Sequence, residues 1–205
     1  MHNSPRRIFH CDCIAGLGLV RVVCVGILAF AGIAVADGER RTVMDLQFDG
    51  AVGEPAWVAQ NDDVMGGVST GGAVVADGVL VFTGSLSLEN NGGFAQVEIR
   101  NLGTDLSGKE GMKLRVRGDG RTYQLRVATN ARYRGSRIAY RAEFPTVAGD
   151  WTTVFVRFTD LEPSHHGDVL DGPPIDLSQV EEMGFLIGDR RAGPFALEVD
   201  WMTVE

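Results

Sequence analysis

The chain has 205 residues, with 27 acidic against 19 basic side chains and a formal net charge of −8. This acidic balance disfavours nucleic acids and anionic membrane surfaces as partners, because both repel negative charge. The three cysteines all precede residue 25, so the rest of the chain has no thiol for nucleophilic catalysis, redox chemistry or a disulfide.

The start of the chain has the pattern of a secretory signal peptide. Arg6 and Arg7 form a basic start, an uncharged apolar run occupies residues 22–36, and a small-x-small cleavage site ends at Ala36. This run is shorter than the roughly 20 residues that a membrane-spanning helix needs. We predict a signal peptide at 1–36, of ordinary or twin-arginine type, and a periplasmic or extracellular protein. An uncleaved membrane anchor is the alternative.

Residues 37–205 are predicted to form a single domain. They keep 16 basic and 26 acidic residues, a net charge of −10. This length is enough to bury an adequate core without disulfides.

Apolar and polar residues alternate along the runs 95–100, 112–117, 123–127 and 195–202. Such alternation is typical of antiparallel strands with one buried face, and glycine-rich turns separate the runs. We predict an all-β fold, an antiparallel β-sandwich of the jelly-roll kind, with about ten strands. The predicted core positions are Val97, Ile99, Leu114, Val116, Leu125, Val127, Leu197, Val199 and Trp201. The positions predicted to face away from it are Gln96, Arg115, Arg126, Glu198 and Met202.

Other segments depart from this alternation. Residues 176–182 are predicted to form one short helical turn, capped by Asp176 or Ser178. The longest predicted loop is 160–175, which contains the pair His165-His166. Two neighbouring histidines would suit a transition metal, and a solvated pair is the alternative.

Two sets of residues are candidates for exposed surfaces that bind a ligand. Lys113, Arg115, Arg117, Arg126, Arg100 and Glu98 are predicted to line one exposed sheet face, either as an ion-pair lattice or as a ligand platform. Trp57 and Trp151 would stack on a sugar ring if they are exposed, and burial in the core is the alternative.

Residues 61–69, Asn-Asp-Asp-Val-Met-Gly-Gly-Val-Ser, combine three side-chain acceptors with two glycines and a serine. This composition predicts a shaped loop. In one interpretation the side chains of Asn61 and Asp62 fold back on backbone N–H groups, while Gly66 and Gly67 take positive φ. In the other, the same side chains contact a ligand.

Further blocks accompany this loop in a fixed order. Trp57 precedes it, Asn-Asn-Gly-Gly-Phe follows at 90–94, and two more blocks lie at 117–123 and 193–201. Together, over about residues 44–205, they resemble the CIA30 family, the domain of complex I intermediate-associated protein 30 and its bacterial relatives. The resemblance implies a galactose-binding-domain-like sandwich. For the mitochondrial relatives it also implies an assembly factor that acts on membrane-arm intermediates of complex I. An exported protein would not reach the matrix-side modules, so this role is not expected to apply unchanged to this chain.

We interpret the protein as a non-catalytic binding or assembly-factor module that recognises a protein or carbohydrate partner through its end loops, 61–69 and 90–94. The alternative is a carbohydrate-binding module, or a saccharide-active hydrolase that uses the acidic loop. No catalytic residue is assigned, because neither Ser69 nor Ser87 lies in a Gly-x-Ser-x-Gly elbow. The candidate contact residues are Trp57, Asn61, Asp62, Asp63, Ser69, Asn90 and Asn91.

Asp62 and Asp63 are also candidate ligands of a structural calcium ion, because carboxylate oxygens suit that cation. No EF-hand spacing is present, and no other cofactor is predicted. From the sequence alone, we expect Asp62→Asn to spare the melting temperature and to weaken partner capture.

Overall fold

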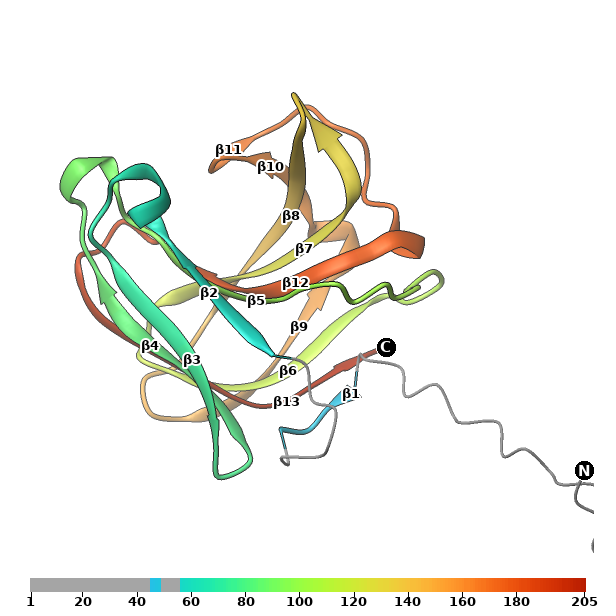
Figure 1. The fold of residues 1–205 in the computed structure, drawn as a ribbon. Helices are drawn as coiled ribbons and strands as arrows, with labels where there is room; N and C mark the ends of the chain where they lie inside the picture. The colour runs from blue at the N-terminus through green and yellow to red at the C-terminus, as the bar shows by residue number, and fades with distance from the viewer. Residues whose placement is uncertain (1–44, 49–55) are drawn as a thin grey trace, which may run out of the picture. The chain divides into compact units, whose positions relative to one another are not determined.

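The computed structural model describes residues 45–48 and 56–205, so the predicted signal peptide lies outside the described residues. The described residues form 13 strands and four short 3₁₀ helices, and the strands build two antiparallel sheets packed as a sandwich (Figure 1). This confirms the predicted fold class. The strand count exceeds the prediction partly because β1 and β11 have only two residues each.

Sheet A has the strand order β3-β4-β13-β6-β9, and β1 pairs with β13 beside this path. Its strands are β1 (Asp45–Leu46), β3 (Thr70–Ala76), β4 (Val79–Leu86), β6 (Gly111–Gly118), β9 (Trp151–Arg157) and β13 (Gly193–Val204).

Sheet B has the strand order β11-β10-β8-β7-β12-β5-β2. Its strands are β2 (Trp57–Asn61), β5 (Ala95–Ile99), β7 (Thr122–Tyr133), β8 (Ser136–Pro145), β10 (Glu162–His165), β11 (Asp168–Val169) and β12 (Val180–Ile187). The 3₁₀ helices are η1 (Asp62–Met65), η2 (Glu89–Asn91), η3 (Phe158–Asp160) and η4 (Leu177–Gln179). Figure 1 shows that sheet B curves, with the end of β2 rising on one side and β8, β10 and β11 on the other.

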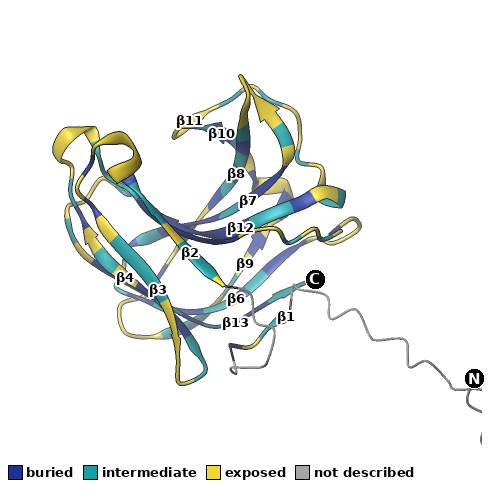
Figure 2. Ribbon diagram, viewed as in Figure 1, coloured by how far each residue is buried: buried dark blue, intermediate teal, exposed yellow. Residues whose placement is uncertain are grey.

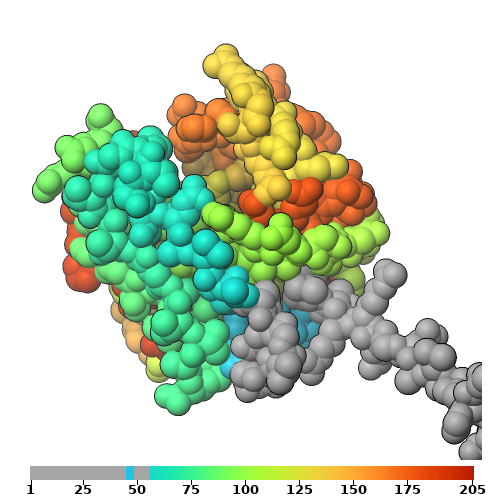
Figure 3. Space-filling view, viewed as in Figure 1, coloured from blue at the N-terminus to red at the C-terminus, as the bar shows by residue number. Residues whose placement is uncertain are grey.

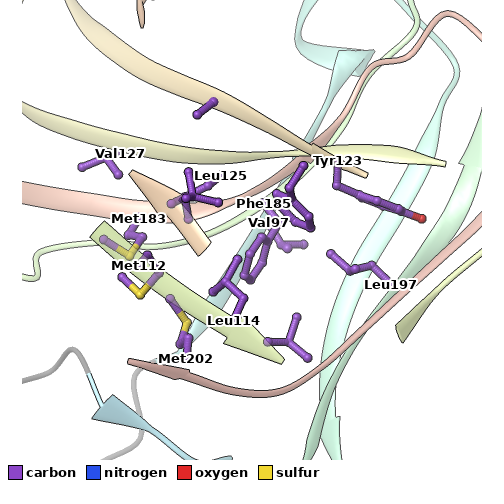
Figure 4. Close-up of a cluster of buried hydrophobic side chains, with 14 of the residues drawn as sticks. Val97, Met112, Leu114, Tyr123, Leu125, Val127, Met183, Phe185, Leu197 and Met202 are labelled. Atoms are coloured by element: carbon purple, nitrogen blue, oxygen red, sulfur yellow. The ribbon is translucent and has the colours of Figure 1, made fainter. Parts of the chain in front are cut away.

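The core lies between the two sheets. Side chains from β5, β6, β7, β12 and β13 meet there, as Figure 4 shows for Val97, Leu114, Leu125 and Leu197. Of the predicted core positions, all except Trp201 are buried, and all of the buried ones except Ile99 belong to one cluster. The alternation in the sequence therefore identified the buried face of these strands correctly.

The prediction for the end of β13 is wrong, because the strand contains a β-bulge. Val199 pairs with Val116 of β6, but the next pair joins Trp201 to Arg115, which leaves one extra residue on β13. The extra residue reverses the alternation beyond it. Met202 is consequently in the core, whereas Trp201 is partly exposed.

The predicted helical turn is shorter than expected. The carboxylate of Asp176 accepts a hydrogen bond from the Ser178 backbone N–H at 3.0 Å, as predicted for a cap, but η4 ends at Gln179 and β12 begins at Val180. The predicted loop 160–175 contains the β10–β11 hairpin, which pairs with β8. The short strands of this hairpin carry too few residues for alternation to reveal them.

The predicted single polar face is also wrong, since its residues divide between the two sheets. Lys113, Arg115 and Arg117 lie on β6 of sheet A and form ion pairs with acidic side chains at positions 205, 200 and 198. The other residues of the set, Arg126, Glu98 and Arg100, belong to sheet B or follow it directly. A period of two residues defines a face of a strand but does not say which sheet the strand joins.

The two tryptophans have different environments. Trp57 packs against the core, and its ring stacks on Phe185 with the centroids 5.8 Å apart. Trp151 lies outside the core cluster, with the guanidinium carbons of Arg115 and Arg117 at 5.0 and 4.9 Å from its ring centroid. Trp57 is therefore partly buried against the core, close to the predicted alternative, whereas the prediction of core burial is wrong for Trp151.

Candidate functional site

Two connecting loops lie side by side at one end of the sandwich. The loop 62–69 joins β2 to β3 and contains η1, and the loop 87–94 joins β4 to β5 and contains η2. Figure 1 shows both rising together beyond the strands, and we call them the loop pair. The pair contains most of the residues predicted to contact a partner.

Asp62 joins the two loops. Its side chain is fully buried, and its Oδ1 accepts a hydrogen bond from the Ser69 backbone N–H at 2.9 Å. Its Oδ2 accepts from the Ser69 hydroxyl at 2.5 Å and from the Gly93 N–H at 2.6 Å, with the Phe94 N–H at 3.4 Å. One carboxylate thus holds together segments that lie about 30 residues apart in the sequence.

Glycines make room for this carboxylate. A Cβ atom on Gly67 would lie 2.3 Å from Cγ of Asp62, and one on Gly92 would lie 2.5 Å from its Oδ2. Gly66 has the predicted positive φ of 88°, but Gly67 does not. The prediction that Gly67 takes positive φ is therefore wrong. Glycine is required there because the Asp62 side chain approaches the backbone closely.

The same contacts set the ionisation of Asp62. Burial by itself would raise the pKa of this carboxyl group, but the hydrogen bonds from Ser69, Gly93 and Phe94 outweigh it and hold the pKa below the ordinary value of 3.8. Asp62 is therefore a buried carboxylate that keeps its charge at neutral pH.

Acid is expected to remove the stability that this carboxylate contributes. Because the pKa of Asp62 is lower in the folded protein than in the unfolded chain, its contribution is present above 3.8 and is lost as the pH falls through the folded-state value. Urea unfolding at about pH 5 and about pH 3 is expected to show a larger loss for the wild type than for Asp62→Asn. Equal losses in the two proteins would contradict this assignment.

Two other predicted contact residues also make internal contacts. The Nδ2 of Asn61 donates to the carbonyl oxygen of Gly71 at 3.1 Å, whereas its buried Oδ1 has no partner among the described residues. The hydroxyl of Ser69 accepts a further hydrogen bond from the Ser87 backbone N–H at 3.0 Å. Asn61 thus ties the end of β2 to β3, and Ser69 ties the first loop to the second.

The remaining predicted residues of the loop pair are exposed. Asn90 donates from its Nδ2 to the carbonyl oxygen of Gly66 at 3.1 Å, a further bond between the loops. Asn90 and Asn91 have φ values of 55° and 58°, a left-handed conformation that asparagine tolerates better than most residues. Asp63 is also exposed.

Sequence reasoning missed the side chains that point outward from this framework. Val64, Met65 and Val68 in the first loop and Leu88 in the second are all exposed. Figure 2 shows both loops as exposed segments at the end of the sandwich. The available signal was the presence of three large apolar residues inside a loop of polar residues and glycines.

The calcium prediction does not fit the geometry of Asp62. Both of its oxygens face N–H or O–H donors, whose hydrogens would oppose a cation at the same position. Within the part of the chain that the structure describes, no group of three or more His, Cys, Asp or Glu side chains is arranged to hold a metal. His165 and His166 lie together, with ring centroids 4.1 Å apart.

No helix among the described residues has the length and hydrophobicity that crossing a bilayer requires.

The sequence matches the family model of complex I intermediate-associated protein 30 (CIA30) over residues 46–199. The chain belongs to the CIA30 family. The matched region of this CIA30 chain includes both loops of the loop pair and the block at 117–123.

Curated relatives carry the same family name. The mitochondrial complex I intermediate-associated protein 30 of Mus musculus is 31% identical over 108 residues, which are 51% of this chain and 33% of that protein. The Neurospora crassa protein of the same name is 33% identical over 95 residues, which are 45% of this chain and 34% of that protein. The CIA30 chain therefore aligns with about a third of the length of these relatives.

Solved structures with a similar fold include carbohydrate-binding modules. The family 11 module of the cellulosomal cellulase Lic26A-Cel5E of Clostridium thermocellum has a TM-score of 0.56 at 12% identity, covering 76% of this chain and 89% of the module. The same module in complex with a β-1,3-1,4-mixed-linked tetrasaccharide has a TM-score of 0.55 at 11% identity, covering 78% and 93%. This similarity concerns the fold alone.

Proposed function

We propose that the protein is a non-catalytic protein-binding module of the assembly-factor type, which docks a protein partner on the tip of the loop pair. Membership of the CIA30 family supports the general role. The observation that carries the specific proposal is the group of four exposed apolar side chains on two loops that Asp62 and Asn90 bond together.

The chemistry of this tip favours a protein surface. Val64, Met65, Val68 and Leu88 offer no side-chain donor or strong acceptor for sugar hydroxyls, whereas an apolar surface of a partner would bury them favourably. Methionine is also enriched at protein interfaces. Asp62, one of the residues predicted to contact a ligand, is buried beneath the tip.

The hydrogen bonds within the loop pair add to this case. A loop that is already held in its binding conformation loses little conformational entropy when a partner docks. The bonds from Gly93 and Ser69 to Asp62, and from Asn90 to Gly66, hold the tip in one arrangement. We place the partner in the periplasm or outside the cell, where the predicted signal peptide would deliver the chain.

The proposal is tested by site-specific crosslinking and substitution. A photoreactive amino acid at position 65 of the full chain in its host should crosslink one protein, to be identified by mass spectrometry and purified. Val64→Ser combined with Met65→Ser should then raise the Kd for this protein about 100-fold, through the lost burial of two apolar side chains.

Val74→Ser is the matched control. Val74 on β3 is 63% exposed and Val64 is 62% exposed, but Val74 lies outside the loop pair. It should leave the Kd within about two-fold. An unchanged Kd for the double variant, or an equal loss for Val74→Ser, would refute docking at the tip.

A further inference from the structure

Strand β9 ends sheet A on the side opposite to β3, and no strand in the described part of the chain pairs with its outer edge. The strand has seven residues, and its register with β6 runs without a bulge. Thr153, Phe155 and Arg157 are exposed along it. An edge strand of this kind presents N–H and C=O groups that can pair with another chain.

The other strands that end the two sheets are short or covered. β11, at one end of sheet B, has only two residues. β2 and β3, at the other ends of the two sheets, lie against each other (Figure 3), and the Nδ2 of Asn61 on β2 donates to the carbonyl oxygen of Gly71 on β3 at 3.1 Å. Of these four strands, β9 is therefore the one long strand whose edge stays open within the described residues.

The hydrogen bonds of β6 show which backbone groups of β9 face the open side. Gly111 of β6 uses its N–H and its carbonyl oxygen on Glu205, at 3.2 and 3.0 Å, so it does not bond to Arg157, its partner on β9. Because the direction of these groups alternates along an antiparallel strand, the odd-numbered residues of β9 turn theirs outward, and the even-numbered ones turn theirs to β6. No hydrogen bond between described residues uses the outward groups.

The strand lacks the features that usually keep an edge apart from other chains. Such features are lysines, prolines, bulges and very short strands. β9 contains no proline, lysine or acidic residue, and its one charged side chain, Arg157, stands at its end. Its other residues are Trp, Thr, Val and Phe, which all favour strands. The edge is therefore suited to take up one more strand.

The sequence of β9 is complementary to itself in the antiparallel direction. When two copies pair about a twofold axis at Val154, Trp151 lies opposite Arg157, and Thr153 lies opposite Phe155. Every odd-numbered residue then faces an odd-numbered residue of the other copy, so all the outward N–H and C=O groups find partners. No two like charges lie opposite each other in this register.

The charges at the two ends of β9 fit the same arrangement. Arg157 forms no ion pair among the described residues, and its guanidinium carbon lies 5.9 Å from the ring centroid of Phe155. Asp150 comes directly before the strand, so the twofold arrangement brings it to the same end of the interface as Arg157 of the second copy. A parallel arrangement would instead set the two arginines side by side.

We propose that the protein forms a dimer in which the β9 strands of two copies pair in antiparallel fashion and join the two copies of sheet A into one continuous sheet. In such a twofold interface the same surface serves on both copies, so the contact closes on itself and no open chain of copies results. The proposal does not rest on docking of a partner at the loop tip.

The first test is sedimentation velocity of the protein purified from its host, which should show a monomer–dimer equilibrium. Thr153→Pro removes an outward N–H but no hydrogen bond to β6. Each copy thereby loses one hydrogen bond across the interface, so the Kd of the dimer should rise at least about ten-fold. Thr153→Val keeps the N–H and is the matched control, which should leave the Kd within about two-fold.

Hydrogen exchange followed by NMR, at a concentration where the dimer dominates, gives a second readout on the wild type. The amides of Thr153 and Phe155 should exchange as slowly as those of Val154 and Val156, which bond to β6. This readout decides if Thr153→Pro does not fold.

Four results would overturn the proposal. They are fast exchange at Thr153 and Phe155 beside slow exchange at Val154, a protein that stays monomeric up to about 100 μM, a dimer that Thr153→Pro leaves unchanged, and sedimentation as a complex with another protein in place of the dimer.

Discussion

Asp62→Asn is expected to lower the free energy of unfolding by about 3 kcal/mol. In the folded protein both carboxylate oxygens accept hydrogen bonds from N–H or O–H donors, three of them within 2.9 Å. An amide in the same place turns an NH₂ group toward one set of these donors, so that at least one buried backbone N–H of Ser69 or Gly93 loses its acceptor. Urea unfolding at neutral pH measures the loss.

Asp63→Asn is the control for this substitution. Asp63 is the next residue in η1 but is exposed, and its replacement should cost less than about 0.5 kcal/mol. The expectation for Asp62→Asn reverses the one drawn from the sequence, where an Asx acceptor appeared replaceable without loss of stability. Equal stability of the two variants would restore the earlier interpretation and would contradict the role of Asp62 as the junction of the loops.

Arg121→Ala is expected to cost about 3 to 5 kcal/mol, because it leaves the carboxylate of Asp189, whose side chain is only 12% exposed, without its partner. Arg121 is 5% exposed, and its Nε and Nη2 donate to the two oxygens of Asp189 at 2.9 and 2.5 Å. Its Nη1 also donates to the carbonyl oxygen of Pro194 at 2.9 Å. The side chain thus ties the β6–β7 turn to the segment between β12 and β13.

Arg117→Ala provides the comparison within the same turn region. Arg117 forms an ion pair with Glu198, but its side chain is 39% exposed. Its removal should cost less than about 1 kcal/mol, since water replaces the lost contact. Chemical denaturation of both variants should separate them by at least about 2 kcal/mol, and similar losses would show that burial of Arg121 is not what makes its ion pair important.

The core was predictable because period-two alternation needs no knowledge of neighbouring strands. Leu114, Leu125 and Leu197 were assigned to the buried face from their own strands alone, and the structure places all three in one cluster. The error at Met202 has the opposite origin, since a bulge depends on how β13 pairs with β6. Local patterns therefore predicted which face of each strand is buried. The exceptions, such as Met202, arise from how the strands pair.

The sequence predicted where the shaped loop lies, but it did not predict the contacts that hold the loop pair together. The composition of 61–69 predicted a shaped loop, yet the donors from Gly93 and Phe94 come from a segment that only the fold brings close to Asp62. The position of the Asp62 side chain against Gly67 also depends on the fold, so the sequence analysis attributed this glycine to positive φ instead. The sequence identified the participating residue types, and the distances required the tertiary structure.

The division of the polar residues between the two sheets was beyond the reach of the sequence. Glu98, Gly184 and Arg126 come from three strands far apart in the chain, and they lie in one row because the strand order is β5-β12-β7. The alternation placed Glu98 and Arg126 on one exposed face together with Arg115, which belongs to sheet A. Only the pairing between strands shows which of these residues share a sheet.

In the loop pair, the residues that hold the loops in place differ from the residues that form the exposed surface, which affects how the surface can change in evolution. Asp62, Gly67 and Gly92 fix the loops from beneath the tip, and the exposed apolar side chains take no part in these contacts. Substitutions at Val64, Met65 and Leu88 therefore change the surface presented while the scaffold keeps its stability. If a partner docks on this tip as proposed, substitutions at a few apolar positions would be enough to direct the same framework to a new partner.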